Sequence, residues 1–190
     1  MLRHNCGIAV ANTLHDVYSF IHYLQHRGRE AAGIAAIRDD GIDVLKWKGT
    51  VDRFDITDLH KIFPGTKYHT FFGHVRYATH GRKDQILEDA HPHVVGGTTS
   101  HRGDHVIIRG ATSAIVHNGQ VNPKFWLDKI DRNKLNSGCD TEALLHYFLV
   151  HNEKNLLTQI PGVYTLAIAD IKRKDVVVLR DRHGVQPGVL

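Results

Sequence analysis

The chain has 190 residues, of which 42% are hydrophobic and 23% charged, as is ordinary for one soluble globular domain. The net charge of +4 comes from scattered basic residues that do not alternate with aromatic ones, so we expect no nucleic-acid partner. No apolar run approaches the roughly 18 residues of a membrane span, and the polar start is too short for a signal peptide. We therefore expect no membrane partner and a cytoplasmic location.

The cysteines and histidines bear on redox state and metal binding. Two cysteines, Cys6 and Cys139, are too few for a disulfide framework and favour a reducing compartment. The sixteen histidines include a group that raises the question of a metal site: His91, His93, His101 and His105. No cysteine pair or His-Glu-x-x-His helix accompanies them. We expect a solvated polar loop there, with no metal and no cofactor in this segment.

The hydrophobic pattern of the first half predicts short elements. In order they are a strand over 6–11, a helix over 14–24, strands over 31–37 and 44–47 around a turn, a short helix over 56–62 and a strand over 71–76. The segment 81–110 is polar and rich in glycine, histidine and threonine. It predicts long loops with one hairpin through 106–109, and long ordered loops are often functional.

The second half predicts more strands and two helices. A strand over 113–116 leads into a tight turn at 117–119, a helix begins at 125 behind Pro123, and an amphipathic helix covers 141–150 with Asp140 as its N-cap. The last strands, over 163–169 and 176–179, are nearly continuously apolar, as is typical of strands covered on both faces. The pattern predicts an α+β protein in which helices sandwich the sheets.

Cys6 is a candidate nucleophile. A thiol has an ordinary pKa of about 8.5 and needs a base. That base is either a histidine or, if residues 1–5 are removed, the α-amine of Cys6 itself. Taken alone, a cysteine at this place is more commonly an inert core thiol.

Arg76 is a candidate anion ligand because it follows a predicted strand. A guanidinium held there can grip a carboxylate with two parallel hydrogen bonds, and Thr79 and His80 can add donors. A surface ion pair is the alternative for Arg76.

Three later residues complete the set. The Asn118 amide and the Gly119 backbone N–H can converge on one oxygen and stabilise the anion of a tetrahedral intermediate, although an ordinary Asn-Gly hairpin turn fits the same letters. The Asp140 carboxylate can bind an ammonium group or cap a helix.

Considered jointly, these segments resemble the class II glutamine amidotransferases, whose glutaminase domain has the N-terminal nucleophile hydrolase fold. The resemblance rests on Cys6-Gly7-Ile8, 24–34, 73–81, His117-Asn118-Gly119 and 139–142. Segments 24–34, 73–77 and 180–187 are similar to amidophosphoribosyltransferases, while 78–81 and 140–142 are similar to glucosamine-6-phosphate synthases. The resemblance implies a four-layer αββα sandwich with largely antiparallel sheets.

The resemblance also implies a role for each candidate residue. Cys6 would be the nucleophile, with its freed amine as the base, and Asn118 and Gly119 would form the oxyanion hole. Glutamine would be held by Arg76 at its α-carboxylate, with Thr79 and His80 nearby, and by Asp140 at its α-ammonium group, while Arg27 and Gly28 would form the wall behind the nucleophile.

The implied activity is hydrolysis of glutamine to glutamate, with ammonia passed to a synthase domain or subunit. The expected acceptor is phosphoribosyl pyrophosphate, used by a glycosyltransferase of purine nucleotide biosynthesis. The alternatives are a glucosamine-6-phosphate or glutamate synthase type of acceptor, or an unprocessed, inactive module that binds glutamine. A metal- or nucleic-acid-binding protein is a weaker third hypothesis.

The domain expectation has two parts. Residues 1–5 form a short leader that is removed to expose Cys6, and residues 6–190 form a type-2 glutamine amidotransferase domain shortened at its C-terminal end. No phosphate-cradling loop follows an acidic pair, so we expect residues 1–190 alone not to bind phosphoribosyl pyrophosphate. The oligomeric state is left open.

Overall fold

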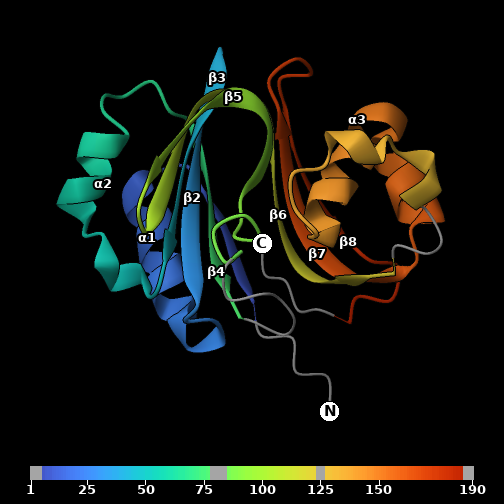
Figure 1. The fold of residues 1–190 in the computed structure, drawn as a ribbon, viewed down its shortest axis with the longest axis horizontal. Helices are drawn as coiled ribbons and strands as arrows, with labels where there is room; N and C mark the ends of the chain where they lie inside the picture. Colours follow the sequence, from blue (N-terminus) through green and yellow to red (C-terminus); the bar gives the residue numbers. More distant parts are fainter. Residues whose placement is uncertain (1–5, 78–84, 123–126, 186–190) are drawn as a thin grey trace.

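The computed structural model describes residues 6–77, 85–122 and 127–185, which form two β-sheets lying face to face between helices (Figure 1). The helices are α1 (Leu14–Tyr23), α2 (Ile56–Ile62) and α3 (Asp140–Gln159). The strands are β1 (Gly7–Ala11), β2 (Ala31–Arg38), β3 (Gly41–Lys48), β4 (Thr70–Arg76), β5 (His93–Arg102), β6 (His105–Val121), β7 (Gly162–Asp170) and β8 (Asp175–Arg180). The 3₁₀ turns are η1 (Leu24–Arg27), η2 (Val51–Arg53), η4 (Leu127–Lys129) and η5 (Arg132–Lys134).

The long strand β6 joins the two sheets. The hydrogen-bonded order is β1-β4-β2-β3-β6-β7-β8, β5 also pairs with β6, and all of these pairs are antiparallel. The first part of β6, 105–111, pairs with β3, whereas its last part, 113–121, pairs with β7. One strand therefore carries the chain from the first sheet into the second (Figure 1).

Three apolar clusters separate four layers. The first lies between α1, α2 and the first sheet, the second between the two sheets, and the third between the second sheet and α3. Successive side chains of strand β2 point to opposite faces of the first sheet. Ile34 and Ala36 belong to the cluster on the helix side, and Ala35 and Ile37 belong to the cluster between the sheets. The predicted α+β fold with an αββα sandwich is confirmed.

Helix α1 packs directly on β4. Thr13 caps it by accepting a hydrogen bond from the Asp16 backbone N–H, and Val17 and Ile21 are fully buried. They face Gly73 of β4, where an added Cβ would lie 2.4 Å from a methyl carbon of Ile21. The glycine therefore allows the helix to sit close to the sheet beside the head of β1.

The prediction of long loops over 81–110 is wrong for the described residues from 93 onward. There β5 and β6 form a hairpin with its turn at Gly103 and Asp104. The far part of β5 is exposed on both faces, which explains its polar sequence. The ladder to β6, and not an apolar pattern, makes it a strand.

The predicted tight turn at 117–119 is also wrong, because these residues lie inside β6 and pair with β7. Gly119 has φ +149°, and an added Cβ would lie 2.0 Å from the Val163 carbonyl oxygen. The glycine meets a close approach of two strands and not the need of a turn.

Three further differences concern the second half. Cys139, and not Asp140, is the N-cap of α3, and the helix is broken at Asn152, which has φ 70° and ψ 178°. Of the helix expected from 125, residues 123–126 lie outside the described part and Leu127–Lys129 form a 3₁₀ turn. Strand β8 leaves Val176 and Val178 exposed, so it is not covered on both faces.

No helix in the described ranges has the length and apolar character needed to cross a membrane.

Candidate active site

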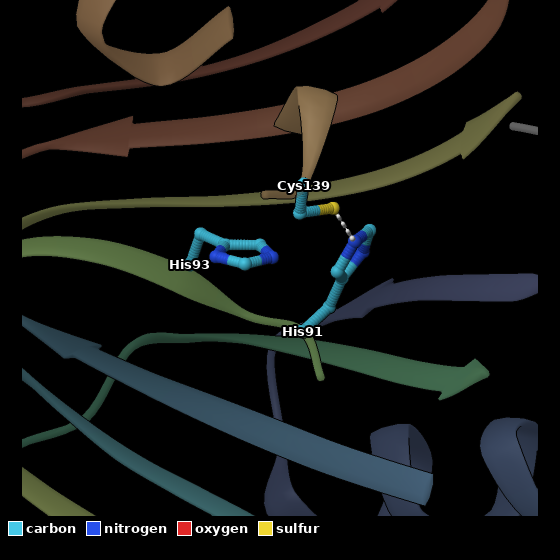
Figure 2. A group of neighbouring side chains, drawn as sticks. All are labelled: His91, His93 and Cys139. Atoms are coloured by element: carbon cyan, nitrogen blue, oxygen red, sulfur yellow. Dashed lines mark hydrogen bonds between the residues drawn. The ribbon is translucent and has the colours of Figure 1, made fainter. Parts of the chain in front are cut away.

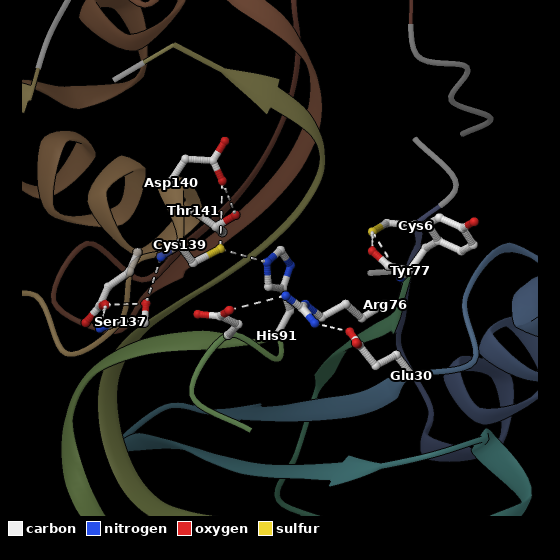
Figure 3. Close-up of polar contacts among 11 residues, drawn as sticks. Cys6, Glu30, Arg76, Tyr77, His91, Ser137, Cys139, Asp140 and Thr141 are labelled. Carbon is white, nitrogen blue, oxygen red and sulfur yellow. Dashed lines mark hydrogen bonds and ion pairs between the residues drawn. The ribbon is translucent and has the colours of Figure 1, made fainter. Parts of the chain in front are cut away.

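Cys6 lies at the head of β1, beside the end of β4. Because Gly7 pairs with Val75 in an antiparallel register, Cys6 faces Arg76 and its neighbour Tyr77. The Tyr77 backbone N–H donates to the Cys6 sulfur over 3.5 Å (Figure 3). Nε of Arg27 donates to the Cys6 carbonyl over 2.9 Å. The predicted role of Arg27 and Gly28 as the wall behind the nucleophile stays a prediction.

Several groups act on the Cys6 thiol. Burial raises its pKa above the ordinary value, and the Asp140 carboxylate adds to this effect. The Tyr77 N–H and the cations Arg76 and Arg27 act in the opposite direction without cancelling it. The thiol therefore stays protonated at neutral pH, and nucleophilic attack by Cys6 needs a base. Arg27 contacts Cys6, and Figure 3 shows Cys6, Arg76 and Asp140 in one part of the molecule.

Arg76 is held by two carboxylates of the chain itself. Its side chain is 12% exposed, Nη1 contacts Glu30, and Nη2 lies 3.3 Å from Asp89 (Figure 3). Arg76 therefore forms ion pairs, as the alternative interpretation of the sequence expected, but these pairs are partly buried and do not lie on the surface. Gly28 allows this geometry, because an added Cβ would lie 2.4 Å from the Arg76 carbonyl carbon.

Binding of a substrate carboxylate by Arg76 stays a prediction. The other two residues predicted near that carboxylate, Thr79 and His80, lie outside the described residues.

Asn118 and Gly119 lie in the last part of β6, where it pairs with β7. Asn118 is 5% exposed, and its Oδ1 has no hydrogen-bond partner within the described ranges. Ile8 of β1 packs in the same cluster as Val116 of β6, so the head of β1 and this end of β6 are neighbours. The predicted oxyanion hole is compatible with this placement and stays a prediction.

Asp140 ties the start of α3 to the end of β6. Its Oδ2 accepts a hydrogen bond from the Val121 backbone N–H over 3.1 Å, and its Oδ1 lies 3.4 Å from the Thr141 hydroxyl and 4.0 Å from Nδ1 of His117. The carboxylate therefore bridges two elements and does not cap its own helix. Its predicted role as the ligand of an ammonium group stays a prediction.

Glu142 was not predicted as a site residue, yet it holds the loop that leads into α3. It is 3% exposed and accepts four hydrogen bonds, from the backbone N–H and side chain of both Asn136 and Ser137, over 2.6–3.0 Å. A buried carboxylate needs such partners. Glu142 thereby sets the position of Cys139 and Asp140.

Histidines gather beside this site, where the sequence predicted a solvated loop. His91 and His93 are 6% and 4% exposed, so that prediction is wrong for both, whereas His101 is exposed. The rings of His74 and His91 lie 4.0 Å apart, and those of His91 and His93 lie 4.9 Å apart. Burial lowers the pKa of all three, so they are neutral at neutral pH.

Cys139 completes a group of metal-ligand type with two of these histidines. One ligand atom each of His91, His93 and Cys139 lies within 4.8 Å of the other two (Figure 2). The His-x-His spacing was visible in the sequence. The cysteine lies 46 positions after His93, and only the docking of α3 against β6 brings it there.

Comparison with known proteins identifies the family. Residues 95–188 match the family model of the glutamine amidotransferase domain. The chain is 30% identical over 182 residues to the chloroplastic amidophosphoribosyltransferase of Glycine max, covering 90% of this chain and 29% of that protein. It is 28% identical over 190 residues to the isomerizing glutamine–fructose-6-phosphate aminotransferase of Francisella tularensis, covering 91% of this chain and 28% of that protein.

The fold has a solved counterpart. The glutamine phosphoribosylpyrophosphate amidotransferase from B. subtilis, complexed with ADP and GMP, superposes with a TM-score of 0.67 at 26% identity, over 96% of this chain and 38% of that chain. The chain thus spans less than a third of the length of the two curated relatives named above. With this fold, this matched model and these relatives, the chain belongs to the class II glutamine amidotransferases, an enzyme family.

Proposed function

We propose that this domain hydrolyses the side-chain amide of glutamine to glutamate and ammonia, with Cys6 as the nucleophile. The observation that carries the proposal is the position of the Cys6 thiol at the head of β1, beside the end of β4 that carries Arg76 and with Nε of Arg27 on its backbone carbonyl. Glutamine carries an α-carboxylate and an α-ammonium group as well as the side-chain amide. An enzyme that attacks this amide needs a nucleophile, a ligand for the carboxylate and a ligand for the ammonium group.

In the proposed reaction the base takes the proton of the Cys6 thiol, and the Cys6 sulfur attacks the amide carbon of glutamine. The developing oxyanion accepts hydrogen bonds from the Asn118 amide and the Gly119 N–H. The amide nitrogen takes a proton from the base and leaves as ammonia, and water then cleaves the thioester to release glutamate. The base is the α-amine of Cys6, which becomes available once residues 1–5 are removed.

Arg76 and Asp140 are proposed to hold the two charged ends of glutamine. Arg76 can accept the α-carboxylate if its longer contact, the 3.3 Å pair with Asp89, gives way. The Glu30 pair would keep the guanidinium aligned. Thr79 and His80 are proposed to lie beside the carboxylate, and Arg27 to support the nucleophile from behind.

The ammonia is proposed to pass to a synthase domain or subunit. The names of the relatives suggest two acceptors: phosphoribosyl pyrophosphate, as in the amidophosphoribosyltransferases, and fructose 6-phosphate, as in the aminotransferase. We favour the first, in purine nucleotide biosynthesis, because segments 24–34, 73–77 and 180–187 are similar to those enzymes. A reducing compartment such as the cytoplasm suits two free thiols.

A module that binds glutamine without hydrolysing it is the second candidate. The raised pKa of Cys6 favours it for any chain in which residues 1–5 are retained, because the thiol then lacks the proposed base.

The experiment is an intact-mass and ammonia-release measurement on the same preparation. We expect active protein to begin at Cys6, and Cys6→Ser to lose nearly all ammonia release because a hydroxyl is a far weaker nucleophile. Ammonia release by protein that retains Met1 would show that the α-amine of Cys6 is not the base. Glutamine binding without ammonia release from protein that begins at Cys6 would favour the binding module.

A further inference from the structure

Three side chains from separate parts of the chain converge beside the proposed active site. His91 precedes β5, His93 opens it, and Cys139 precedes α3, and their side chains point toward one another (Figure 2). His91 Nε2 lies 3.7 Å from the Cys139 sulfur. In a tetrahedral zinc site with bonds of about 2.0–2.3 Å, neighbouring ligand atoms are about 3.4–3.8 Å apart. One pair already has that separation, and all three atoms lie within 4.8 Å of one another.

The ring nitrogens of the two histidines differ in their partners. The Nε2 of His93 is buried with no hydrogen-bond partner among the residues that the structure describes. His91 Nδ1 faces the His117 backbone N–H over 3.4 Å. Histidines that bind metals usually donate the N–H of their other ring nitrogen to a carbonyl or carboxylate, so metal binding by His91 Nε2 requires the ring proton on Nδ1 and an opening of the 3.4 Å contact with the His117 N–H. The orphaned Nε2 of His93 is a buried polar atom that a metal ion would satisfy.

The surrounding charges include both signs. The carboxylates of Asp140 and Asp89 act on Cys139, while Lys46, buried nearby, opposes a cation. Lys46 itself is offset by Glu142 and Asp89. Arg76 also acts on His91 and His93 and opposes a cation, so the carboxylates of Asp140, Asp89 and Glu142 face two cations, Lys46 and Arg76.

We propose that His91, His93 and Cys139 form a binding site for a transition-metal ion that prefers nitrogen and sulfur ligands, with Zn²⁺ as the leading candidate. The metal displaces the proton of the Cys139 thiol, which is released to solvent, and binds the thiolate and one nitrogen of each histidine. A water molecule can fill the fourth position. The site adjoins Asp140, whose Oδ1 lies 3.7 Å from the Cys139 sulfur, but metal binding there does not require the proposed chemistry at Cys6.

The competing description is a hydrogen-bond chain without metal. In it the His117 N–H donates to His91 Nδ1, and His91 Nε2–H donates to the Cys139 sulfur. This arrangement satisfies His91 and Cys139 and leaves the Nε2 of His93 without a partner in the described part. The test must therefore separate ligation by all three side chains from this pair.

Co²⁺ is the probe, because its thiolate complexes give a charge-transfer band in the near ultraviolet. The whole chain, reduced and stripped with a chelator, is titrated with Co²⁺ and then competed with Zn²⁺. The variants are Cys139→Ser and His93→Gln. The matched controls are Cys6→Ser, which removes the other thiol, and His101→Gln, which removes an exposed histidine of the same strand.

We expect one Co²⁺ per chain with a thiolate band, displaced by Zn²⁺, and a higher melting temperature with Zn²⁺ bound. Cys139→Ser should lose the band, and His93→Gln should weaken Zn²⁺ binding by at least about 100-fold. Both controls should behave as the parent. The proposal is overturned if the parent shows no band, if the band is lost in Cys6→Ser, or if His93→Gln binds as tightly as the parent. Should Cys139→Ser fail to fold, the His93→Gln titration decides, with circular dichroism to show that its fold is intact.

Discussion

At the scale of single residues, two kinds of carboxylate compete for Arg76. Glu30 and Asp89 of the chain pair with it in the structure, and the α-carboxylate of the proposed substrate would bind the same guanidinium. A guanidinium has five N–H donors in a fixed plane, so it can keep one carboxylate and exchange the other. Lysine has one charged centre and cannot do both with the same geometry.

We therefore predict that Arg76→Lys weakens glutamine binding, and that Asp140→Asn does the same from the ammonium end. Each loses a charge-assisted hydrogen bond, worth roughly 1.5–3 kcal/mol or about 10–150-fold in affinity. Binding is measured by calorimetry in a Cys6→Ser background, so that no turnover occurs. Unchanged affinity in both variants would refute the assignment.

Asp89→Asn supplies the matched test of the competition at Arg76. Removing the competing charge should tighten glutamine binding, because Nη2 of Arg76 is then released. If binding instead weakens, Asp89 orients Arg76 and does not compete with the substrate.

At the scale of elements, the start of α3 decides where Cys139 and Asp140 lie. This helix has no side-chain N-cap bond. Its entry depends instead on Glu142, which reaches back to the loop at Asn136 and Ser137. A first-turn glutamate also interacts favourably with the helix dipole.

We predict that Glu142→Ala lowers the free energy of unfolding by about 2–4 kcal/mol, since it removes a buried, hydrogen-bonded charge and leaves the backbone N–H groups of Asn136 and Ser137 without this partner. Chemical unfolding in urea measures this. Glu153→Ala is the control, because Glu153 forms an exposed pair with Arg173, and such pairs contribute little to stability. Equal losses in the two variants would show that the Glu142 contacts are not important for stability.

The same elements show what could be predicted from the sequence. Strands β1 to β4 and helices α1 and α2 follow from local apolar periodicity and from the turn at Asp39-Asp40-Gly41. Strand β5 does not, because its outer half is polar and exposed and is a strand only through pairing with β6. The sequence also does not show why a glycine is needed at position 119. The close neighbour is the Val163 carbonyl of β7, more than forty positions later.

The candidate site also has a part that the sequence predicts and a part that it does not. Cys6, Arg27, Arg76 and Asp140 lie in recognisable segments, and the structure brings them into one region (Figure 3). The pairing of Arg76 with Asp89 and the approach of Cys139 to His91 depend on how distant elements dock. No local pattern encodes those contacts, so only the folded structure reveals them.

At the scale of the whole molecule, a buried carboxylate, that of Asp43, contributes to the connection between the two sheets. Asp43 of β3 sits at the irregular part of the β3–β6 pairing and is 5% exposed. It accepts hydrogen bonds from the Tyr68 hydroxyl over 2.7 Å and the Gly110 backbone N–H over 2.9 Å, and it pairs with Arg38 and Arg109. One carboxylate thus links β3 to the strand that joins the two sheets.

This carboxylate predicts a specific acid sensitivity of the fold. Burial alone would raise the pKa of Asp43, but the hydrogen bonds from Tyr68 and Gly110 and the two arginines outweigh it and lower the pKa below its ordinary value of 3.8. The folded state therefore binds a proton less readily than the unfolded state. The contribution of Asp43 to stability is complete above that ordinary pKa and is lost as the pH falls through the lower folded value.

We predict that Asp43→Asn lowers the free energy of unfolding by about 1–3 kcal/mol at pH 7, because a hydrogen-bonded charge is removed from a buried position. The difference between parent and variant should shrink as the pH is lowered from about 5 to below 3, where the parent carboxylate also becomes protonated. Urea unfolding at several pH values measures both effects, and Asp39→Asn, at a carboxylate that is 99% exposed, is the control that should change neither. A parent–variant difference that stays constant from neutral to acid pH would show that the Asp43 charge does not contribute to stability, and that the link between β3 and β6 rests on shape and neutral hydrogen bonds alone.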